Sequence, residues 1–380
     1  MTELIGYCEA QSGALRRDIE ALVGFESPSD DKAAVDRCGA YIVGMLEDAG
    51  ASVERIPQLQ RGDHVRAEFP GGPRRILLLG HFDTVWPVGQ LERMPIREEG
   101  GRLHGPGIYD MKASIALTLL AVRAIRALLP RTAHIVMLWT TDEEVGSGTS
   151  RALIEKEAAQ CDAVLVPEPS LPGGACKTQR KGCGEFRLAV RGISAHAGLD
   201  PGKGASAVHE LARQILAVEK FGDPGRGISV NVGVIAGGTR PNVVAETAEA
   251  SIDVRVPTMA DATRVEADIR ALAAADPRVS LEISGGFDRP PLERAPGVAR
   301  LYSQARAVAR SLGRELGEGS AGGGSDGNFT GALGVPTLDG LGPEGDGAHA
   351  LHEHVLLADL PWRAAFIAGL IDRINAEPTQ

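Results

Sequence analysis

The sequence predicts an α/β protein in which helices cover both faces of a mostly parallel sheet. Strand-like apolar runs alternate with helical spacing through Glu168, which is the pattern typical of such a sheet. After Lys177 the order changes, and beyond Leu301 the first pattern resumes. The 380 residues therefore predict two domains, the second inserted into the first, and each is long enough to bury its own core.

The first predicted domain comprises residues 1–176 and 288–380. It begins with two helices, because apolar residues recur at helical spacing between residues 12 and 50 and Ser27-Pro28-Ser29 interrupts them. The predicted strands are 53–56, 65–69, 76–79, 134–139 and 163–166, the long helix is 110–129, and the elements after the insertion are 301–312, 335–338 and 355–374.

The second predicted domain comprises residues 177–287 and has another order of elements. These elements are a strand at 185–191, a helix at 205–221, strands at 228–236 and 245–256, a helix at 260–275 and a strand at 279–284. This βαββαβ order is that of the split βαβ, or ferredoxin-like, motif. We therefore expect a small ferredoxin-like domain inserted into the first.

The composition excludes several kinds of binding partner and indicates where in the cell the protein is found. A net charge of -10 disfavours nucleic acid and anionic membranes. The amino terminus has no basic segment followed by an apolar one, and no run of about 18 uncharged apolar residues occurs, so we expect a soluble cytoplasmic protein. The five cysteines are odd in number and form no C-x-x-C pair, which disfavours a disulfide framework and a thiolate metal site.

Acidic and histidine side chains follow the predicted strands where each strand ends. Glu143 and Glu144 come after a buried apolar run, and two adjacent glutamates at that place need a positive partner. In an open α/β sheet, groups that do chemistry collect beyond the carboxyl ends of the strands. Because imidazole and carboxylate ligands without cysteine suit Zn²⁺, and also Mn²⁺ or Co²⁺, the set indicates a hydrolytic metal site. Its other members are His81, Asp83, Asp110, Glu168 and His349.

Each of these residues taken alone has an ordinary structural explanation. A single histidine after a strand more often makes a structural hydrogen bond, which is our interpretation of His104, His134 and His209. The two adjacent glutamates would also suit the amino terminus of the following helix. A serine nucleophile at Ser325 is disfavoured, because no predicted strand comes directly before it.

Six segments, in chain order, closely resemble the motifs of one enzyme superfamily. They are Gly80-His81-Phe82-Asp83-Thr84, Gly105-Pro-Gly-Ile-Tyr-Asp110-Met-Lys112, Thr141-Asp-Glu-Glu144-Val-Gly146, Glu168-Pro169, Ser194-Ala-His196-Ala-Gly198 and Gly322-Gly-Gly324-Ser-Asp326. The family is the co-catalytic di-zinc metallopeptidases, which include glutamate carboxypeptidase, acetylornithine deacetylase and succinyl-diaminopimelate desuccinylase. The resemblance covers nearly the whole chain, and the glutamate carboxypeptidase branch looks nearest.

The resemblance implies a site for two metal ions. Asp110 would bridge them, His81 and Glu168 would complete one site, and Glu144 and His349 would complete the other. Three carboxylates carry a charge of -3 against +4 on two Zn²⁺, so the cluster stays close to neutral, which a buried site tolerates. We expect two Zn²⁺ as cofactors, with Co²⁺ or Mn²⁺ as alternatives.

The last histidine ligand has two neighbours of the same kind, His352 and His354. We assign His349, because Glu353 stands four residues beyond it and matches the closing H-x-x-x-E pattern of the family. Family members also carry a cis peptide bond directly after the bridging aspartate.

The resemblance also implies roles for two further carboxylates. Glu143 would be the general base, because its neighbour Glu144 is a ligand and so holds it close to a water that the metal acidifies. Asp83, two residues beyond His81, would fix the imidazole from behind.

The inserted domain would add residues that hold substrate. In the family, the residue matching His196 reaches across a dimer interface to stabilise the oxyanion, and those matching Asn242 and Arg255 help to hold substrate. Backbone N–H groups of Gly323 and Gly324 would approach a substrate carboxylate. Plainer alternatives are a loop hydrogen bond for His196, a salt bridge to a neighbouring aspartate for Arg255, and a flexible loop for the glycines.

The predicted function is metal-dependent hydrolysis of an amide bond next to a free carboxylate. It would release a C-terminal amino acid such as glutamate from a peptide or an N-acyl amino acid. The alternatives are deacylation of N-acetylornithine or N-succinyl-diaminopimelate, and a non-catalytic binding protein on the same fold. Since the ligands and the base are all present, we favour an enzyme. The family is commonly dimeric through its inserted domain, so we expect a homodimer in which this domain acts as a lid and a dimerisation surface.

Overall fold

The computed structural model describes residues 1–130 and 132–377, and these residues form two compact units. Unit 1 contains Met1–Gln179, Glu293–Ala321 and Ser325–Gln380, and unit 2 contains Arg180–Leu292 and Gly322–Gly324. Unit 2 therefore interrupts unit 1 in the chain. In the described residues, every helix is too short or too polar to span a bilayer.

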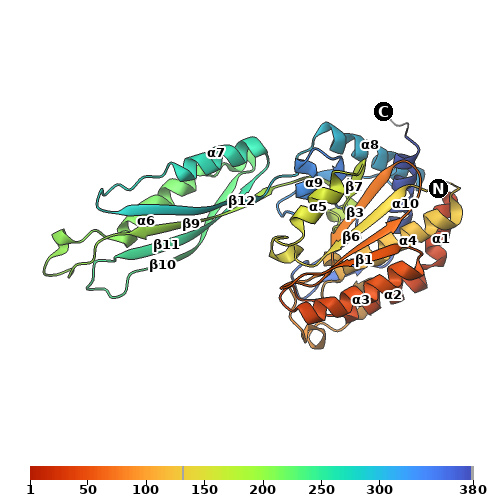
Figure 1. The fold of residues 1–380 in the computed structure, drawn as a ribbon, viewed down its shortest axis with the longest axis horizontal. Coiled ribbons are helices and arrows are strands. Elements are labelled where there is room, and N and C mark those ends of the chain that lie inside the picture. The colour runs from red at the N-terminus through yellow and green to blue at the C-terminus, as the bar shows by residue number, and fades with distance from the viewer. Residues whose placement is uncertain (131, 378–380) are drawn as a thin grey trace. The chain divides into compact units, whose positions relative to one another are not determined.

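Unit 1 is built on a mixed sheet with the strand order β1-β2-β6-β3-β7-β14 (Figure 1). β3 pairs in parallel with β6 and β7, and β7 pairs in parallel with β14. The pairs β1–β2 and β2–β6 are antiparallel, so the predicted parallel arrangement holds only from β6 to β14. Residues 57–63, which join β1 to β2, are too few for a parallel crossover. The strands are β1 (Ser52–Ile56), β2 (His64–Phe69), β3 (Arg75–His81), β6 (His134–Thr140), β7 (Ala163–Leu165) and β14 (Thr337–Leu338).

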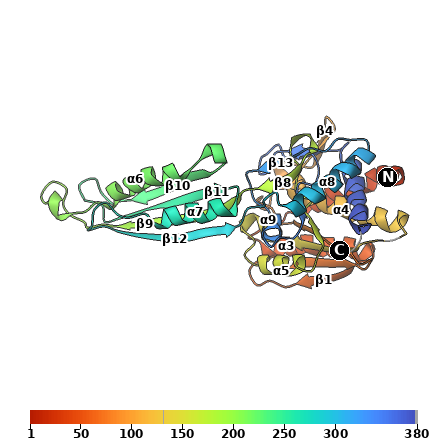
Figure 2. The ribbon, with the colours of Figure 1, turned by 90° about the horizontal axis from the view of Figure 1, so that it is seen from above.

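Both faces of this sheet are covered by helices. Ile76 and Leu78 of β3 pack in one apolar core, and Leu77 and Leu79 pack in another, because successive side chains of a strand point to opposite faces. The helices of the first core are α1 (Thr2–Ala10), α2 (Ser12–Gly24), α3 (Lys32–Asp48), α4 (Ala113–Leu128), α8 (Pro296–Ser311) and α10 (Leu360–Asn375), and those of the second are α5 (Arg151–Ala158) and α9 (Gly327–Ala332) (Figures 1 and 2).

Two small sheets in unit 1 were not predicted. In one of them, β16 pairs with β5, and His354 lies opposite His104. This pairing brings the chain after β5 next to the chain before β16, where the N–H of Gly105 donates to the carbonyl of Glu353. The strands of this sheet are β4 (Arg97–Glu99), β5 (Arg102–His104), β15 (Gly345–Asp346) and β16 (His354–Leu356), and the other sheet joins β8 (Cys176–Arg180) to β13 (Glu318–Ala321).

Unit 2 is a four-stranded antiparallel sheet with two helices (Figure 2). Phe186, Leu188 and Val190 of β9 are buried in a core with residues of α6 and α7, while the residues between them are exposed or half-buried. One face of the sheet therefore carries the core. In chain order the elements are β9 (Gly182–Arg191), α6 (Ala207–Val218), β10 (Ser229–Gly237), β11 (Thr247–Val256), α7 (Met259–Arg270) and β12 (Ser280–Arg289), and the spatial order is β10-β11-β9-β12.

Candidate functional site

The candidate residues of unit 1 lie at the ends of its strands and in two loops. β3 ends at His81, Glu168 follows β7, and Glu144 lies in the 3-10 turn η3 (Glu143–Val145) after β6. Because β3, β6 and β7 are parallel, their carboxyl ends meet at one edge of the sheet. Asp110 lies in the turn before α4, and His349 lies in the loop before β16.

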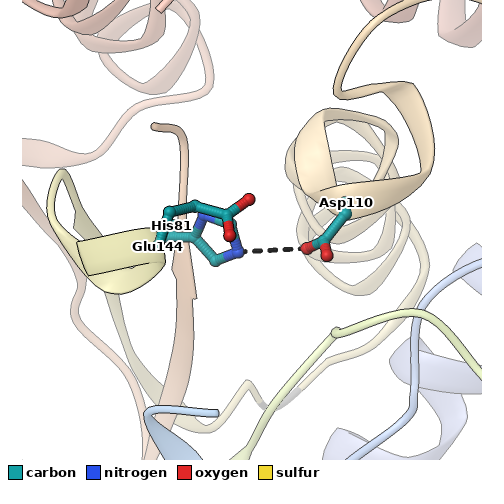
Figure 3. Close-up of side chains that lie close together, drawn as sticks. All are labelled: His81, Asp110 and Glu144. Carbon is teal, nitrogen blue, oxygen red and sulfur yellow. Dashed lines mark hydrogen bonds and ion pairs between the residues drawn. The ribbon is translucent and has the colours of Figure 1, made fainter. Parts of the chain in front are cut away.

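These five side chains form one cluster. Nε2 of His81 lies 3.2 Å from Oδ1 of Asp110 and 3.4 Å from Oε1 of Glu168. Nε2 of His349 lies 3.1 Å from Oε2 of Glu144. One ligand atom from each of His81, Asp110 and Glu144 can be chosen so that all three lie within 4.8 Å of one another, and Figure 3 shows these side chains together.

Asp110 faces one histidine with each of its carboxylate oxygens. Oδ1 lies 3.2 Å from Nε2 of His81, and Oδ2 lies 3.6 Å from Nε2 of His349. A carboxylate in this position can share its two oxygens between two cations.

The turn that carries Asp110 is held by Glu353. Asp110 has the non-helical angles φ -116° and ψ 94°, and the Asp110–Met111 peptide bond is cis, as the resemblance implies. Each carboxylate oxygen of the buried Glu353 accepts two hydrogen bonds, at 2.8 to 3.1 Å. Their donors are the backbone N–H groups of Gly107, Tyr109 and Asp110 and the indole N–H of Trp86. In the sequence, Glu353 served only to choose His349, because the H-x-x-x-E pattern marks this residue but does not reveal its hydrogen bonds to the turn.

Asp83 fixes both a histidine and the turn that follows β6. Its carboxylate accepts hydrogen bonds from the backbone N–H groups of Glu143 and Glu144, each at 3.3 Å, and from the hydroxyl of Ser29 at 2.7 Å. Nδ1 of His81 lies 3.1 Å from the carbonyl oxygen of Asp83 and 3.4 Å from Oδ1. When Nδ1–H donates there, Nε2 presents its lone pair to the cluster, which is the orientation of a metal-binding imidazole.

The electrostatics of the cluster reveal an excess of negative charge. Burial would lower the pKa of His81, but hydrogen bonds with Asp110 and two further carboxylates outweigh it and raise the pKa well above its usual value. The hydrogen bond with Glu144 raises the pKa of His349 to about 9. Burial raises the pKa of Glu144. Protons on the imidazoles thus compensate charge that a divalent cation would compensate better.

The donor set fits divalent metal ions. Two imidazole nitrogens and three carboxylates converge, and Zn²⁺ takes nitrogen and oxygen ligands of these kinds. A carboxylate held behind the ligand histidine is also the usual partner of a metal-bound imidazole.

His349, and neither of its two neighbouring histidines, reaches the cluster. Nδ1 of His354 lies 2.9 Å from the carbonyl of His352, and its ring lies 5.1 Å from that of His104. Nε2 of His352 lies 3.7 Å from Asp346. His349 has φ +60°, a left-handed conformation that residues other than glycine adopt rarely and most often at functional sites.

Two predicted residues of unit 2 lie together in its loops. Nδ1 of the exposed His196 accepts hydrogen bonds from the N–H groups of Gly198 and Leu199, each at 3.1 Å. The N–H of Ala197 donates to the carbonyl of Asn242. The loop hydrogen bond expected as the plainer explanation of His196 is therefore present, and it leaves Nε2 as the N–H donor of the neutral ring.

Arg255 makes the salt bridge that we considered as its plainer explanation. Its Nε and Nη2 bind the carboxylate of Asp253 at 2.8 to 3.0 Å, and Nη1 lies 2.6 Å from Sγ of Cys183. The guanidinium remains about one-third exposed. A role in holding substrate stays a prediction.

The two glycines predicted to approach substrate contact the same arginine, Arg180. The carbonyls of Gly323 and Gly324 accept hydrogen bonds from Nη1 of Arg180, at 3.2 and 2.8 Å. A Cβ atom on Gly324 would lie 2.5 Å from Cδ of Arg289 and 3.3 Å from Sγ of Cys183. A side chain on Gly324 would therefore displace that of Arg289, whereas Gly323 has open space around its Cα.

Ser325 does not have the surroundings of a nucleophile. It is fully buried, and its hydroxyl donates to Asp339 at 2.5 Å and accepts the N–H of Gly327 at 3.1 Å. Both contacts hold the hydroxyl in the segment before α9.

Residues 77–373 match the family described as Peptidase family M20/M25/M40. The chain belongs to this family. The predicted resemblance is thereby confirmed, and the protein is a hydrolase of the metallopeptidase and amidohydrolase class. It is 29% identical to carboxypeptidase G2 of Pseudomonas sp. (strain RS-16) over 96% of this chain and 90% of that enzyme. It is 31% identical to succinyl-diaminopimelate desuccinylase of Xanthomonas oryzae pv. oryzae (strain MAFF 311018) over 90% of this chain and 94% of that enzyme.

Solved structures share this fold. Aminopeptidase PepT from Bacillus cereus ATCC 10987 superimposes with a TM-score of 0.85 at 21% identity, covering 96% of this chain and 98% of that one. The metallo-carboxypeptidase Sso-CP2 of the M20 family, from Sulfolobus solfataricus, superimposes with a TM-score of 0.72 at 16% identity, covering 94% and 99%.

Proposed function

We propose that this M20 hydrolase cleaves an amide bond next to a free carboxylate and releases a C-terminal amino acid such as glutamate from a peptide or an N-acyl amino acid. The observation that carries the proposal is the position of Asp110 between His81 and His349. Similarity to carboxypeptidase G2 along nearly the whole chain supports the substrate class.

Two Zn²⁺ ions would be held by the clustered residues. Asp110 would bind both ions, His81 and Glu168 would bind one, and Glu144 and His349 the other. When bound, the ions would supply Lewis-acid polarisation of the scissile carbonyl and activation of a water for attack.

Glu143 would act as the general base. Its backbone N–H donates to Asp83, so the turn that carries it is fixed relative to the ligand His81. Its side chain is half-buried beside Glu144. A carboxylate in this place can take the proton of the attacking water and later give it to the leaving amine.

Residues of unit 2 would hold the polar groups of the substrate. The N–H at Nε2 of His196 can donate to the developing oxyanion, because Nδ1 is occupied as an acceptor. Asn242, Arg255 and the backbone N–H groups of Gly323 and Gly324 would hold the carboxylate of the leaving amino acid.

Unit 2 would also form a homodimer interface and a lid. β10 is an edge strand of its sheet, and such a strand presents unpaired backbone groups for another strand. Val234 and Ile235 on β10 are 63% and 64% exposed, and Leu216 on α6 is 62% exposed. Light scattering should give twice the chain mass, and a Val234→Lys/Ile235→Lys double variant should give a monomer.

A second candidate function is deacylation of N-acetylornithine or N-succinyl-diaminopimelate. The similarity to succinyl-diaminopimelate desuccinylase favours it. The two candidates share the chemistry of the metal cluster and differ in the groups on either side of the scissile bond.

A panel of N-acyl amino acids and dipeptides, each with a free and an amidated carboxyl group, tests the proposal. The full chain loaded with Zn²⁺ or Co²⁺ should cleave the free acids and spare the amides, and a chelator should abolish the activity until metal is restored. Equal cleavage of the amides would contradict recognition of the carboxylate. Metal binding without cleavage of any member would favour a non-catalytic binding protein.

A further inference from the structure

A hollow of about 320 Å³ in unit 1 shares a wall with the candidate metal cluster. Its lining includes Pro28, Asp30, Val85, Pro87, Glu144 and Val145. Since Glu144 belongs to the cluster, a group that occupies this hollow lies beside the bond to be cleaved. Its volume is at the lower end of the range for small-molecule sites, which suits one substituent of a substrate.

The apolar walls of this hollow are formed by half of its lining residues, and Ser29, Asp30, Thr84 and Glu144 form the rest. Val85 and Val145 are 43% and 49% exposed, and each faces the hollow from a different loop. Pro28 and Pro87 complete these walls. Contact with an apolar substrate group would remove these apolar side chains from water, which favours binding of such a group.

The charge in the lining is negative. Among the described lining residues, the ionisable side chains are the carboxylates of Asp30 and Glu144. Bound metal ions would neutralise the carboxylate of Glu144, so Asp30 would be the remaining charge in the lining. Asp30 is exposed and, within the described part of the chain, makes no hydrogen bond or ion pair. Arg61 contacts the same loop through the carbonyl of Ser29, but it does not line the hollow.

Building on the proposed function, we propose that this hollow receives the acyl side of the substrate and that Asp30 selects against a negative charge there. Among the described lining residues none carries a positive charge that could bind the carboxylate of the leaving amino acid, which leaves the hollow to the other end of the substrate. The preferred acyl group is then apolar and either neutral or terminated by an ammonium, as is the amino-terminal residue of a dipeptide. A dicarboxylic acyl group such as succinyl is disfavoured.

Three acyl groups of similar length on the same amino acid test this selection. They are succinyl, its neutral isostere succinamoyl, and the cationic 4-aminobutyryl group. The full chain loaded with Zn²⁺ should hydrolyse the succinyl compound with a kcat/KM lower than that of the other two by about fivefold or more, a discrimination that one exposed charge can supply.

Charge variants then assign the selection to this hollow. Asp30→Asn should make the kcat/KM values of the succinyl and succinamoyl compounds similar. Asp30→Lys should raise the kcat/KM of the succinyl compound above that of the 4-aminobutyryl compound. Val85→Lys introduces a positive charge on another wall of the hollow and should also raise the kcat/KM of the succinyl compound relative to that of the 4-aminobutyryl compound. Asp48→Asn removes an exposed carboxylate at the end of α3, away from the lining, and should leave the order unchanged.

The outcomes separate the two proposals. Hydrolysis of all three compounds with a kcat/KM for succinyl equal to or above that for succinamoyl would overturn the role of the hollow and leave the hydrolase assignment intact. The role of the hollow would also be overturned if the order of the three kcat/KM values were the same in Asp30→Lys and Val85→Lys as in the parent protein. Failure to hydrolyse any member, with metal bound, would contradict the proposed function and this inference together.

Discussion

Nε2 of His81 lies 3.2 Å from Oδ1 of Asp110, although 29 residues separate them in the chain. β3 delivers the histidine at its last residue, and the turn before α4 delivers the aspartate. The second oxygen of Asp110 faces His349, which lies more than 200 residues further along. Two remote segments are therefore joined through one carboxylate, and the roles proposed for the surrounding residues depend on that arrangement.

Replacement of Glu143 by Gln tests the base. The variant keeps the ligands and the turn, because the contact to Asp83 uses the backbone N–H of residue 143. We expect kcat to fall by about 10²- to 10⁴-fold while the metal content is unchanged, since an amide cannot accept the proton of water. Metal analysis and steady-state kinetics measure the two quantities, with Glu54→Gln on the exposed strand β1 as control. Near-normal turnover would remove Glu143 from this role.

Stability of the metal-free protein should fall as the pH rises. The pKa of His349 in the folded protein is raised from 6.5 to about 9 by its hydrogen bond with Glu144. A raised pKa means that the stabilisation is complete below about pH 6.5 and is lost as the pH rises through about 9. Urea midpoints of the chelator-treated protein between about pH 6 and pH 9.5 measure this loss.

Two comparisons test whether the loss of stability at high pH comes from the histidines of the cluster. His349→Gln should reduce the dependence of stability on pH and leave the part that His81 contributes, and the zinc-loaded protein should lack both parts because the imidazoles are then ligands. The same slope in His349→Gln and in the parent protein would show that other groups cause it.

Glu353→Gln should weaken metal binding without unfolding the protein. The buried carboxylate accepts four hydrogen bonds, three of them from the turn that carries Asp110, and an amide can accept with only one of its two polar atoms. We expect metal affinity to drop by about 10- to 100-fold, as for other groups that orient ligands. Metal titration with a chelating indicator measures it. Glu99→Gln, an exposed carboxylate on β4, should bind metal normally, and unchanged affinity in Glu353→Gln would contradict the positioning role.

Leu77→Ala should destabilise unit 1 through the second core. Leu77 is fully buried in the layer formed with α5 and α9. A cavity in such a layer costs about 2–5 kcal/mol. Leu59→Ala is the matched control, because Leu59 is 99% exposed and its loss should change the free energy of unfolding by less than about 0.5 kcal/mol. Equal urea midpoints for the two variants would show that the second core contributes little.

Much of the fold could be predicted, because the strands and helices of both units carry strong periodic signals. The burial alternation of β9 follows directly from its sequence. The small sheet of β4, β5, β15 and β16 was missed, since strands of two or three residues have too short a period to detect. α1 was missed as well, because its apolar residues do not form a clear stripe and only Leu4 and Cys8 are buried.

The candidate site was more accessible to sequence reasoning than its supports. Strand ends and ordered motifs identified His81, Glu144 and Glu168, which the structure brings into one cluster with the others. The role of Glu353 depends on backbone N–H groups more than 240 residues away, and residue types do not encode such contacts. The contact of Arg255 with Cys183 depends on the pairing of β9 with β11 and could not be predicted for the same reason, whereas its salt bridge with Asp253 on the same strand could be.

A crystal structure with zinc, with anomalous scattering recorded at the zinc edge, shows whether Asp110 is shared by two ions. We expect two peaks in unit 1, each at about 2.0–2.2 Å from one carboxylate oxygen of Asp110, with His81 and Glu168 on one ion and His349 and Glu144 on the other. Peaks remote from Asp110, or an empty cluster in crystals grown with ample zinc, would contradict this arrangement.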